Sequence, residues 1–551
     1  MIETAIAAIC VLQGGGAWET RLHSRGETIF DNHGSSLVGL GDVNGDGVPD
    51  FAVGEPLHQI SGFMVGQVLV FSGAQDEEVL FSIPGDPVYP IAEMGYSVNS
   101  IADLSGDGIS EILVGAPGGG GLLGYAALVN GRDGNRIFEH WGLNPDDWFG
   151  GVVIGIGDAT GDGLSDYLIS APFANILGNA EAGEVHLFSG VDGTFQYNLR
   201  GSGAGQKYGK KLARLGDVDS DGHADFLISS GSGLFGTVHV VSGKFGQELY
   251  RLSSFYLGDH FGASIAGLGD VDGDGVPDFI VGAPDHPDIW GSRIGAAYVF
   301  SGDSGELLHF WEGYSYQTDF GHSVAGPGDI NGDQVPDIAV GSPDLWRIGQ
   351  EDPVGGVFLY SGVDFSLIRI IDGYEVNSNF GWSCSWVGDF EGDGRDELLI
   401  GAQSERYQGI SVGGAYVISF DPYCTPSATT LSASLGGTIT FQHDFPESEA
   451  GVEYAFLASS GLEEYMINYK GVDIPLANTL LLRETMQAPP RFFHNARGQL
   501  DQDGRASTTI DFPPGVLNGW IDKTFAFACV TFDPPGQPRL SSARMVVKIL
   551  P

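Results

Sequence analysis

The stretch DVNGDGVPD, from Asp42 to Asp50, decides how this chain of 551 residues is organised. Six further stretches repeat its pattern: DLSGDGISE from Asp103, DATGDGLSD from Asp158, DVDSDGHAD from Asp217, DVDGDGVPD from Asp270, DINGDQVPD from Asp329 and DFEGDGRDE from Asp389. Successive copies begin 61, 55, 59, 53, 59 and 60 residues apart. Self-similarity at such a period indicates a repeat architecture in which each unit is one supersecondary element.

Each repeat contains four short runs typical of β-strands, which we name a to d, separated by Gly, Pro and Asp turns. In the fifth repeat these runs are FGASIAGLG from Phe261, DFIVGAP from Asp278, GAAYVFSG from Gly295 and ELLHFWEG from Glu306. No helical period accompanies them. One four-stranded sheet cannot bury both of its faces, whereas seven sheets stacked radially can. The sequence therefore predicts an all-β fold with a seven-bladed β-propeller.

The two ends of the repeat region complement each other. The seventh repeat supplies runs a, b and c, but it then continues into PYCTPSATT from Pro422, so its run d is missing. The stretch WETRLHSRG from Trp18 stands where a run d would, without an a, b or c of its own. We therefore expect the N-terminal stretch to fill the outer place in blade seven and to close the ring.

The nine-residue loop of each repeat carries oxygen ligands at alternate positions. Positions one, three, five and nine are Asp, Asn, Ser, Thr or Glu, and the backbone carbonyl of position seven adds a fifth oxygen. Such a turn can surround a cation at about 2.3–2.6 Å, which suits calcium better than magnesium. The spacing matches the first half of an EF-hand loop, but the glutamate at position twelve is absent and both flanks are strands. The predicted ligands for up to seven calcium ions are Asp42, Asn44, Asp46, Val48, Asp50, Asp103, Ser105, Asp107, Ile109, Glu111, Asp158, Thr160, Asp162, Leu164, Asp166, Asp217, Asp219, Asp221, His223, Asp225, Asp270, Asp272, Asp274, Val276, Asp278, Asp329, Asn331, Asp333, Val335, Asp337, Asp389, Glu391, Asp393, Arg395 and Glu397.

Calcium should contribute strongly to the stability of these loops. Their four side-chain ligand positions hold 24 of the 71 Asp and Glu residues, and without metal the carboxylates of one loop repel one another. Gln334 replaces the position-six glycine of the sixth loop, where the turn requires a positive φ, at a cost of about 1 kcal/mol. We therefore expect the sixth site to be the weakest. The alternative is that the loops are polar turns that bind no metal.

The unit FG…GD.(D/N)GDG..D..(V/I)GAP…G..(V/F)SG resembles the FG-GAP repeat over about Trp18 to Asp421. That repeat is familiar from the seven-bladed propeller of integrin alpha chains and from many secreted bacterial proteins. Three repeats depart from the pattern: HGSSL from His33 lacks the aromatic residue, ISSG from Ile228 replaces GAP, and the seventh reads IGAQ from Ile400. The resemblance implies metal-ligand roles in all seven loops, and adhesion or macromolecular recognition rather than catalysis.

The b–c loops are the candidate ligand site. In a four-strand meander the a–b and c–d turns share one face of the disc, and the b–c and d–a loops share the other. The b–c loops of blades five, six and seven each carry an arginine and an aromatic residue, although the chain has only 25 Lys and Arg. These residues form a candidate patch for an acidic or carbohydrate partner: Trp290, Arg293, Trp346, Arg347, Arg406 and Tyr407. Alternatively, the rings pack over the blade ends and the arginines bind carbonyls.

The chain divides into three segments. Residues 1–16 hold a short apolar stretch followed by small residues, which makes them a candidate signal peptide, although Glu3 and the lack of a basic residue leave a frayed N-terminus open. Residues 17–423 form the predicted propeller. Residues 424–551, with runs such as TITFQHDF and TFAFACVTFD, predict a smaller β-sandwich. Cys424 and Cys529 could form a disulfide in an oxidising compartment, which would leave Cys384 unpaired.

Charge and motifs restrict the function. The net charge of −46 argues against nucleic acid and against anionic lipid as partners. No apolar run approaches the roughly 18 residues of a spanning helix, so we expect no transmembrane segment. The chain has no G-x-S-x-G elbow, no H-E-x-x-H pair and no Cys/His zinc spacing. We therefore predict a secreted or cell-surface, non-enzymatic protein that recognises or adheres to a protein or polysaccharide on the face opposite calcium. A purely structural surface protein and a polysaccharide lyase or hydrolase are the alternatives.

Overall fold

The computed structural model describes residues 17–550 apart from short gaps. The gaps are residues 29, 76–77, 90, 119–122, 232–234, 255, 314–317, 347–351, 429, 460–466, 470–471, 475, 477–490, 518, 520–522, 534–536 and 543–544. The candidate signal peptide, residues 1–16, therefore lies outside the described residues. In the described part almost every element is a strand, and no helix there has the length and apolarity needed to cross a membrane.

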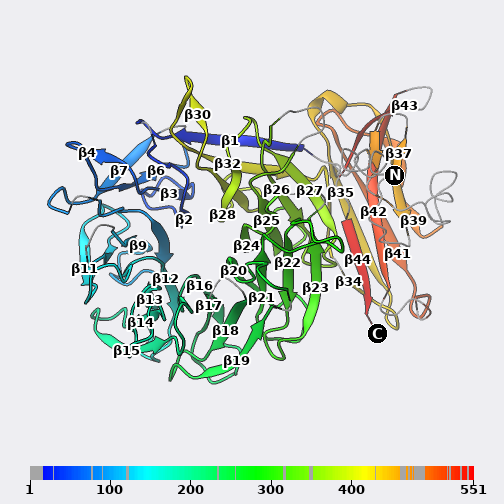
Figure 1. Cartoon of the computed structure of the whole chain (residues 1–551). Coiled ribbons are helices and arrows are strands. Elements are labelled where there is room, and N and C mark those ends of the chain that lie inside the picture. Colours follow the sequence, from blue (N-terminus) through cyan, green and yellow to red (C-terminus); the bar gives the residue numbers. More distant parts are fainter. Residues whose placement is uncertain are drawn as a thin grey trace.

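Seven four-stranded antiparallel sheets are arranged around a common axis (Figure 1). The innermost strands of neighbouring sheets contact one another in a ring, so each sheet is one blade of a propeller. From the inside outward, the strands of blades one to three are β2 (Leu37–Gly41), β3 (Asp50–Glu55), β6 (Gln67–Phe71) and β7 (Val79–Pro84); β8 (Ser97–Ile101), β9 (Glu111–Ala116), β10 (Tyr125–Val129) and β11 (Arg136–Trp141); and β12 (Val153–Gly157), β13 (Asp166–Ala171), β14 (Glu184–Phe188) and β15 (Phe195–Arg200).

Blades four to seven repeat this order. Their strands are β16 (Leu212–Gly216), β17 (Asp225–Gly231), β18 (Gly236–Val241) and β19 (Glu248–Ser253); β20 (Ser264–Gly269), β21 (Asp278–Ala283), β22 (Ala296–Phe300) and β23 (Leu307–Glu312); β24 (Ser323–Gly328), β25 (Asp337–Ser342), β26 (Gly356–Tyr360) and β27 (Leu367–Asp372); and β28 (Phe380–Gly388), β29 (Glu397–Ala402), β32 (Gly414–Asp421) and β1 (Ala17–Arg25). The predicted all-β, seven-bladed propeller is confirmed.

The N-terminal strand closes the ring, as the sequence predicts. β1 pairs antiparallel with β32, so that Ala17 lies opposite Asp421 and Arg25 lies opposite Gly414. It is the outermost strand of blade seven, in the place that the missing run d would fill. Because the first and last segments of the propeller share one sheet, opening the ring requires breaking this ladder.

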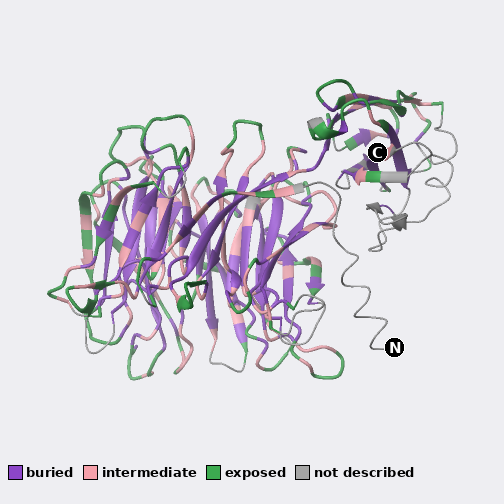
Figure 2. Ribbon diagram, turned by 90° about the horizontal axis from the view of Figure 1, so that it is seen from above, coloured by how far each residue is buried: buried purple, intermediate pink, exposed green. Residues whose placement is uncertain are grey.

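Burial follows the position of each strand in its blade. All six residues of β21 are buried, whereas the outer strand β23 has three exposed residues, two partly buried residues and one buried residue, Trp311. One apolar cluster joins Leu227 and Val238 of blade four to Phe261 and Val281 of blade five. Figure 2 shows buried residues along the strands and exposed ones in the loops at both ends. The cores therefore lie between blades, which explains why the aromatic residue of the repeat recurs.

In blades one, two, five, six and seven, a glycine in strand b sets the distance to the next blade; blades three and four have serine there. A Cβ on Gly282 would lie 2.0 Å from the carbonyl oxygen of Gly321 in the next blade, and one on Gly115 would lie 2.1 Å from that of Gly150. Gly321 and Gly150 belong to the aromatic-glycine pair, and both have positive φ. The glycines of the two motifs therefore pack backbone against backbone, which leaves no room for a side chain.

A β-sandwich follows the propeller. One sheet contains β33 (Cys424–Pro426), β35 (Gly437–Asp444), β41 (Arg505–Phe512) and β39 (Phe493–His494). The other contains β34 (Thr430–Ser432), β44 (Met545–Leu550), β42 (Thr524–Asp533), β36 (Glu453–Ser459) and β40 (Arg497–Gln499), with β43 (Gln537–Ser541) paired to β42. Phe441 of the first sheet meets Phe456 and Phe527 of the second, with ring centroids 4.6 and 5.0 Å apart. The predicted sandwich is confirmed.

The suggested disulfide between Cys424 and Cys529 is wrong. Both residues are free thiols in the sandwich core, as Cys384 is in the propeller. Cys424 Sγ instead lies 3.1 Å from Nδ1 of His443, which is 1% exposed. Burial raises the pKa of both sandwich thiols well above the usual value. Both cysteines therefore serve as small apolar core residues.

Candidate metal centres and the opposite face

The a–b loops share one backbone arrangement, built around the carboxylate at position one. In the first loop, Asp42 accepts hydrogen bonds from the N–H groups of Gly45, Asp46 and Gly47 at 2.7, 3.1 and 2.8 Å. Asp46 in turn accepts one from the N–H of Val48 at 2.9 Å. Gly47, at position six, has a φ of 93°. The turn thus orients its ligand side chains through backbone N–H groups.

The carboxylate at position nine ties the loop to the rest of the blade. Asp50 is fully buried and accepts hydrogen bonds from the N–H groups of Val43, Asn44 and Gly73 at 2.9, 3.2 and 2.9 Å. Gly73 belongs to the c–d turn, so this one side chain joins both turns of the metal face. Oδ2 accepts two of these bonds and Oδ1 accepts one, so Oδ1 keeps a lone pair for a cation.

Burial disfavours the ionised form of several position-nine carboxylates. It raises the pKa of Asp225 and of Asp278 to about 6 and that of Glu397 to about 8, each despite hydrogen bonds from backbone N–H groups. Other acidic side chains of the same loop raise these pKa values further. A divalent cation would offset both effects, because it attracts the charged form.

Three loops bring three carboxylates together. Ligand oxygens lie within 4.8 Å of one another in the second, fourth and fifth loops. This donor set, made only of hard oxygens, fits calcium. Among the described residues, the other four loops do not bring three carboxylates within this distance of one another. In the first, third and sixth loops, the residue at position three is neutral. The converging carboxylates are Asp103, Asp107 and Glu111; Asp217, Asp219 and Asp225; and Asp270, Asp272 and Asp278.

The sixth and seventh loops differ from the others. Gln334 adopts the expected positive φ, 67°, and its N–H still donates to Asp329 Oδ2 at 2.7 Å, as glycine does at this position elsewhere. Glu391, at position three of the seventh loop, forms an ion pair with Arg21 of the closing strand, with Nε and Oε1 2.7 Å apart. Arg395 pairs with Asp393 in the same loop. Arginine therefore engages two predicted ligands of the seventh site.

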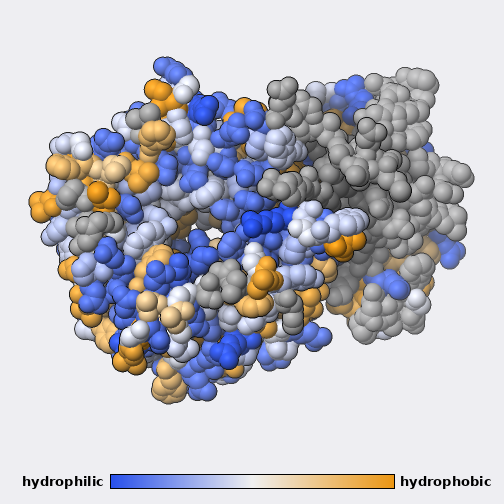
Figure 3. Space-filling model, viewed as in Figure 1, coloured by the Kyte–Doolittle hydropathy of each residue, from blue (hydrophilic) through white to orange (hydrophobic). Residues whose placement is uncertain are grey.

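A central hollow of about 970 Å³ lies on the other face of the disc, where the b–c and d–a loops meet. Figure 3 shows an opening at the centre of the disc. The residue after the aromatic-glycine pair contributes to its wall in every blade, including the first, where His33 takes the aromatic place. These seven residues are Ser35, Tyr96, Gly151, Lys210, Ala263, His322 and Trp382. Sequence reasoning missed them, although their fixed place in the repeat was a usable signal.

The wall of the hollow combines aromatic rings with lysines. Tyr96, Trp148 and Phe173 form a chain of ring contacts, with centroids 5.4 and 4.9 Å apart. Lys210 and Lys211 also line the hollow, and both are solvent-exposed. Desolvation by the protein around the hollow, followed by repulsion from a neighbouring lysine, lowers the pKa of each of them. Asp285 and Asp319 add carboxylates to the lining, so the wall can make stacking, cationic and anionic contacts.

The aromatic side chains of the candidate patch are at least partly exposed. Trp290 is 83% exposed and Trp346 is 44% exposed, so neither ring is packed away over a blade end. Arg293 Nη1 lies 3.0 Å from Asp285 Oδ1. The arginine carbon Cζ of Arg25 lies over the ring of Tyr407, 5.3 Å from its centroid.

The patch and the hollow are separate features. None of the described members of the patch lines the hollow. Arg406 and Tyr407 form the short strand β30, which pairs with β31 (Ile410–Ser411) in the b–c hairpin of blade seven. Arg347 lies outside the described residues. The two features are therefore distinguishable by mutation.

Comparisons with known proteins show which repeat family and which proteins this chain resembles. The FG-GAP repeat model matches residues 33–71 and 261–300. Integrin alpha-V of Gallus gallus is 30% identical over 232 residues, which cover 39% of this chain and 22% of that protein. Integrin alpha-5 of Xenopus laevis is 31% identical over 213 residues, or 35% and 20% of the two chains. Integrin alpha-PS2 of Drosophila melanogaster is 29% identical over 281 residues, or 48% and 16%.

The matches thus span less than a quarter of each of these relatives. The chain is an FG-GAP repeat protein with an integrin-alpha-like β-propeller.

Proposed function

We propose that this protein is a secreted or cell-surface propeller, stabilised by calcium, that recognises or adheres to a protein or polysaccharide without catalysis. The ligand would bind on the face opposite the calcium loops. The observation that carries the proposal is the central hollow, which combines Tyr96, Trp148 and Phe173 with Lys210 and Lys211 on that face. Adhesion is supported by the similarity to proteins named integrin alpha.

The different roles proposed for the two faces of the disc follow from the blade topology. Calcium would bind where backbone N–H groups and buried carboxylates already fix each loop, as around Asp42 and Asp50. The opposite loops carry the side chains that vary between blades. A rigid disc holds such loops in place before a ligand arrives, which lowers the entropic cost of binding.

Aromatic walls suit either class of ligand. Trp148 and Tyr96 can stack on sugar rings or bury apolar side chains of a protein, and aromatic residues are enriched at binding hot spots. Lys210 and Lys211 add attraction for carboxylate or sulfate groups on either ligand. The net charge of −46 opposes that attraction at long range, so we expect contacts within the hollow to dominate.

Glycan and protein arrays, probed with the full chain in calcium and again with a chelator, test the proposal. Calcium-dependent binding supports recognition, turnover of a glycan indicates a lyase or hydrolase, and silence on both arrays favours a structural protein. For any ligand found, Trp148→Ala and Lys210→Ala test the hollow. Trp290→Ala, Trp346→Ala and Arg347→Ala test the patch. Binding that survives all five changes would contradict a site on this face.

A further inference from the structure

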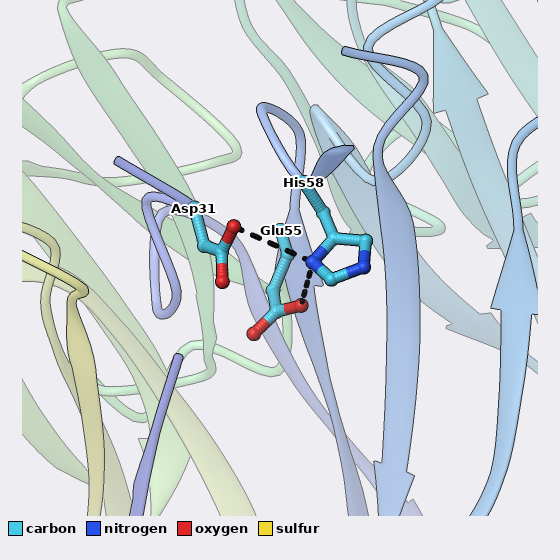
Figure 4. Close-up of side chains that lie close together, drawn as sticks. All are labelled: Asp31, Glu55 and His58. Carbon is cyan, nitrogen blue, oxygen red and sulfur yellow. Dashed lines mark ion pairs between the residues drawn. The ribbon is translucent and has the colours of Figure 1, made fainter. Parts of the chain in front are cut away.

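A cluster of metal-ligand side chains lies away from the calcium loops, beside the closure of the ring. Asp31 belongs to the segment that leads from β1 into blade one, Glu55 is the last residue of β3, and His58 follows it in the b–c turn. One ligand atom of each lies within 4.8 Å of the other two. Figure 4 shows the three side chains converging.

The cluster occurs where blade one breaks the repeat. Glu55 occupies a position that holds a small residue in the six other blades: Ala116, Ala171, Ser230, Ala283, Ser342 and Ala402. His33 stands where the other blades have Met94, Phe149, Tyr208, Phe261, Phe320 and Phe380. Blade packing requires neither a carboxylate nor an imidazole at these positions. Both exchanges introduce groups that bind metals or orient metal ligands.

The imidazole of His58 lies between two carboxylates and forms long ion pairs with both, drawn as dashed lines in Figure 4. Its Nδ1 is 3.4 Å from Asp31 Oδ1 and 3.5 Å from Glu55 Oε2. This nitrogen is fully buried and has no hydrogen-bond partner. Ligands about 2.0–2.1 Å from a tetrahedral zinc ion lie about 3.3–3.4 Å from one another. The two distances are therefore long for hydrogen bonds and close to the spacing of zinc ligands.

Neighbouring groups hold the carboxylates in place. The N–H of Thr28 donates to Asp31 Oδ2 at 2.6 Å, and the hydroxyl of Thr28 donates to Oδ1, the oxygen that also faces His58. His33 Nδ1 lies 2.8 Å from Glu55 Oε1, and the amide of Gln67 donates to Glu55 Oε2 at 2.6 Å. Supporting hydrogen bonds of this kind orient ligands in metal sites.

The charge of the cluster calls for a divalent cation. Asp31 and Glu55 are both fully buried, and a buried carboxylate is costly unless a positive charge accompanies it. Without metal, balancing both would take one proton on His58 and a second on His33, whose Nδ1 lies 2.8 Å from Glu55 Oε1. A divalent cation bound at Nδ1 would balance both carboxylates.

We propose that Asp31, Glu55 and His58 bind one zinc ion, a metal that accepts imidazole nitrogen together with carboxylate oxygen. Calcium prefers oxygen ligands alone, so the two kinds of site select different metals. The zinc ion would fasten the segment after the closing strand to blade one. It would therefore stabilise the closed ring at the face opposite the calcium loops.

Titration of the full chain with zinc, in excess calcium to saturate the acidic loops, tests the proposal. Calorimetry should find one tight zinc equivalent. Cobalt should replace zinc and give the visible absorption of a tetrahedral site with nitrogen and oxygen ligands. Glu55→Ala and His58→Ala should each weaken zinc binding by at least about ten-fold, and His33→Phe by about 10- to 100-fold through the loss of ligand support.

A matched control is His286→Ala, because His286 follows Ala283 in blade five as His58 follows Glu55 in blade one. This change should leave the zinc equivalent intact. Glu55→Ala restores the residue type of other blades, and Glu55→Gln keeps the shape, so at least one should fold, as circular dichroism would show. Zinc should raise the unfolding temperature of the wild type and not that of either folded Glu55 variant.

Two results would overturn the site. The first is a calcium-saturated wild type that takes up neither zinc nor cobalt. The second is a zinc equivalent that persists in folded Glu55 and His58 variants. Neither result bears on ligand recognition at the central hollow, whose test uses arrays and other residues.

Discussion

Replacing Gly282 with alanine should force two blades apart. The added Cβ would lie 2.0 Å from the carbonyl oxygen of Gly321 and 2.2 Å from Oγ of Ser264, which itself donates to that carbonyl at 2.8 Å. Real Cβ atoms essentially never approach a neighbour below 3.0 Å. The neighbouring backbone must therefore move by about 1 Å. This movement also strains the hydrogen bond of 2.9 Å that the N–H of Gly262 donates to the carbonyl oxygen of Gly282.

Overpacking of this kind costs about 1–3 kcal/mol, and we expect the upper end because the obstacle is backbone rather than a flexible side chain. The midpoint of guanidinium unfolding in saturating calcium, followed by tryptophan fluorescence, measures the loss. Ser229→Ala is the matched control. Ser229 occupies the equivalent place in blade four, already carries a Cβ, and buries a hydroxyl oxygen without a hydrogen-bond partner.

That control should be neutral or slightly stabilising, because it removes a buried unpaired hydroxyl. A second control, Gly203→Ala, places a Cβ where the nearest atom is 4.0 Å away and should change stability by less than about 1 kcal/mol. If Gly282→Ala unfolds at the same denaturant concentration as these controls, the close approach of the two glycines does not limit blade spacing, and our account of the repeat fails.

Three further predictions concern metal, closure and pH. Chelation of calcium should lower the unfolding temperature, because it leaves opposed carboxylates in the loops; an unchanged melting curve would exclude a structural metal. Deleting Ala17–Arg25 should expose the edge of β32 and cause self-association, visible in size-exclusion chromatography as a larger species absent from the full chain. Burial lowers the pKa of His443 to about 3, so the unfolded chain binds more protons than the folded sandwich as pH falls from about 6.5 to 3. The free energy of unfolding of the sandwich should fall by at most about 5 kcal/mol over that pH range, as hydrogen exchange in β35 would report. His443→Gln should make this free energy less dependent on pH.

The repeat made most of the fold predictable. Strand-forming runs recur at a nearly constant period, so the assignment of each loop is supported by the others. The missing outer strand of blade seven could therefore be matched to the stretch from Trp18. The predicted positive φ at Gln334 followed from the turn alone. These inferences succeeded because they depend on local backbone geometry that every blade must satisfy.

The failures involve contacts between distant segments. The ion pair of Arg21 with Glu391 joins residues 370 positions apart, and no spacing rule connects them. The suggestion of a disulfide between Cys424 and Cys529 assumed that two strand cysteines would meet, whereas Cys424 Sγ contacts His443. The central hollow was missed for a related reason. Its wall takes residues from every blade, so no single repeat reveals it.

A residue that departs from the repeat is informative only once the ring is known. Lys210, in blade four, and Trp382, in blade seven, occupy the same place in their repeats, and closure of the disc brings both to one wall. Glu55 and His33 depart in a single blade, and the fold places Glu55 beside both His33 and Asp31, which lies outside the repeat strands. The repeat fixes the backbone, so these exchanges change chemistry at little cost to the fold. In such a protein, function therefore depends on the residues that depart from the repeat pattern, and closure of the ring determines which of these residues act together.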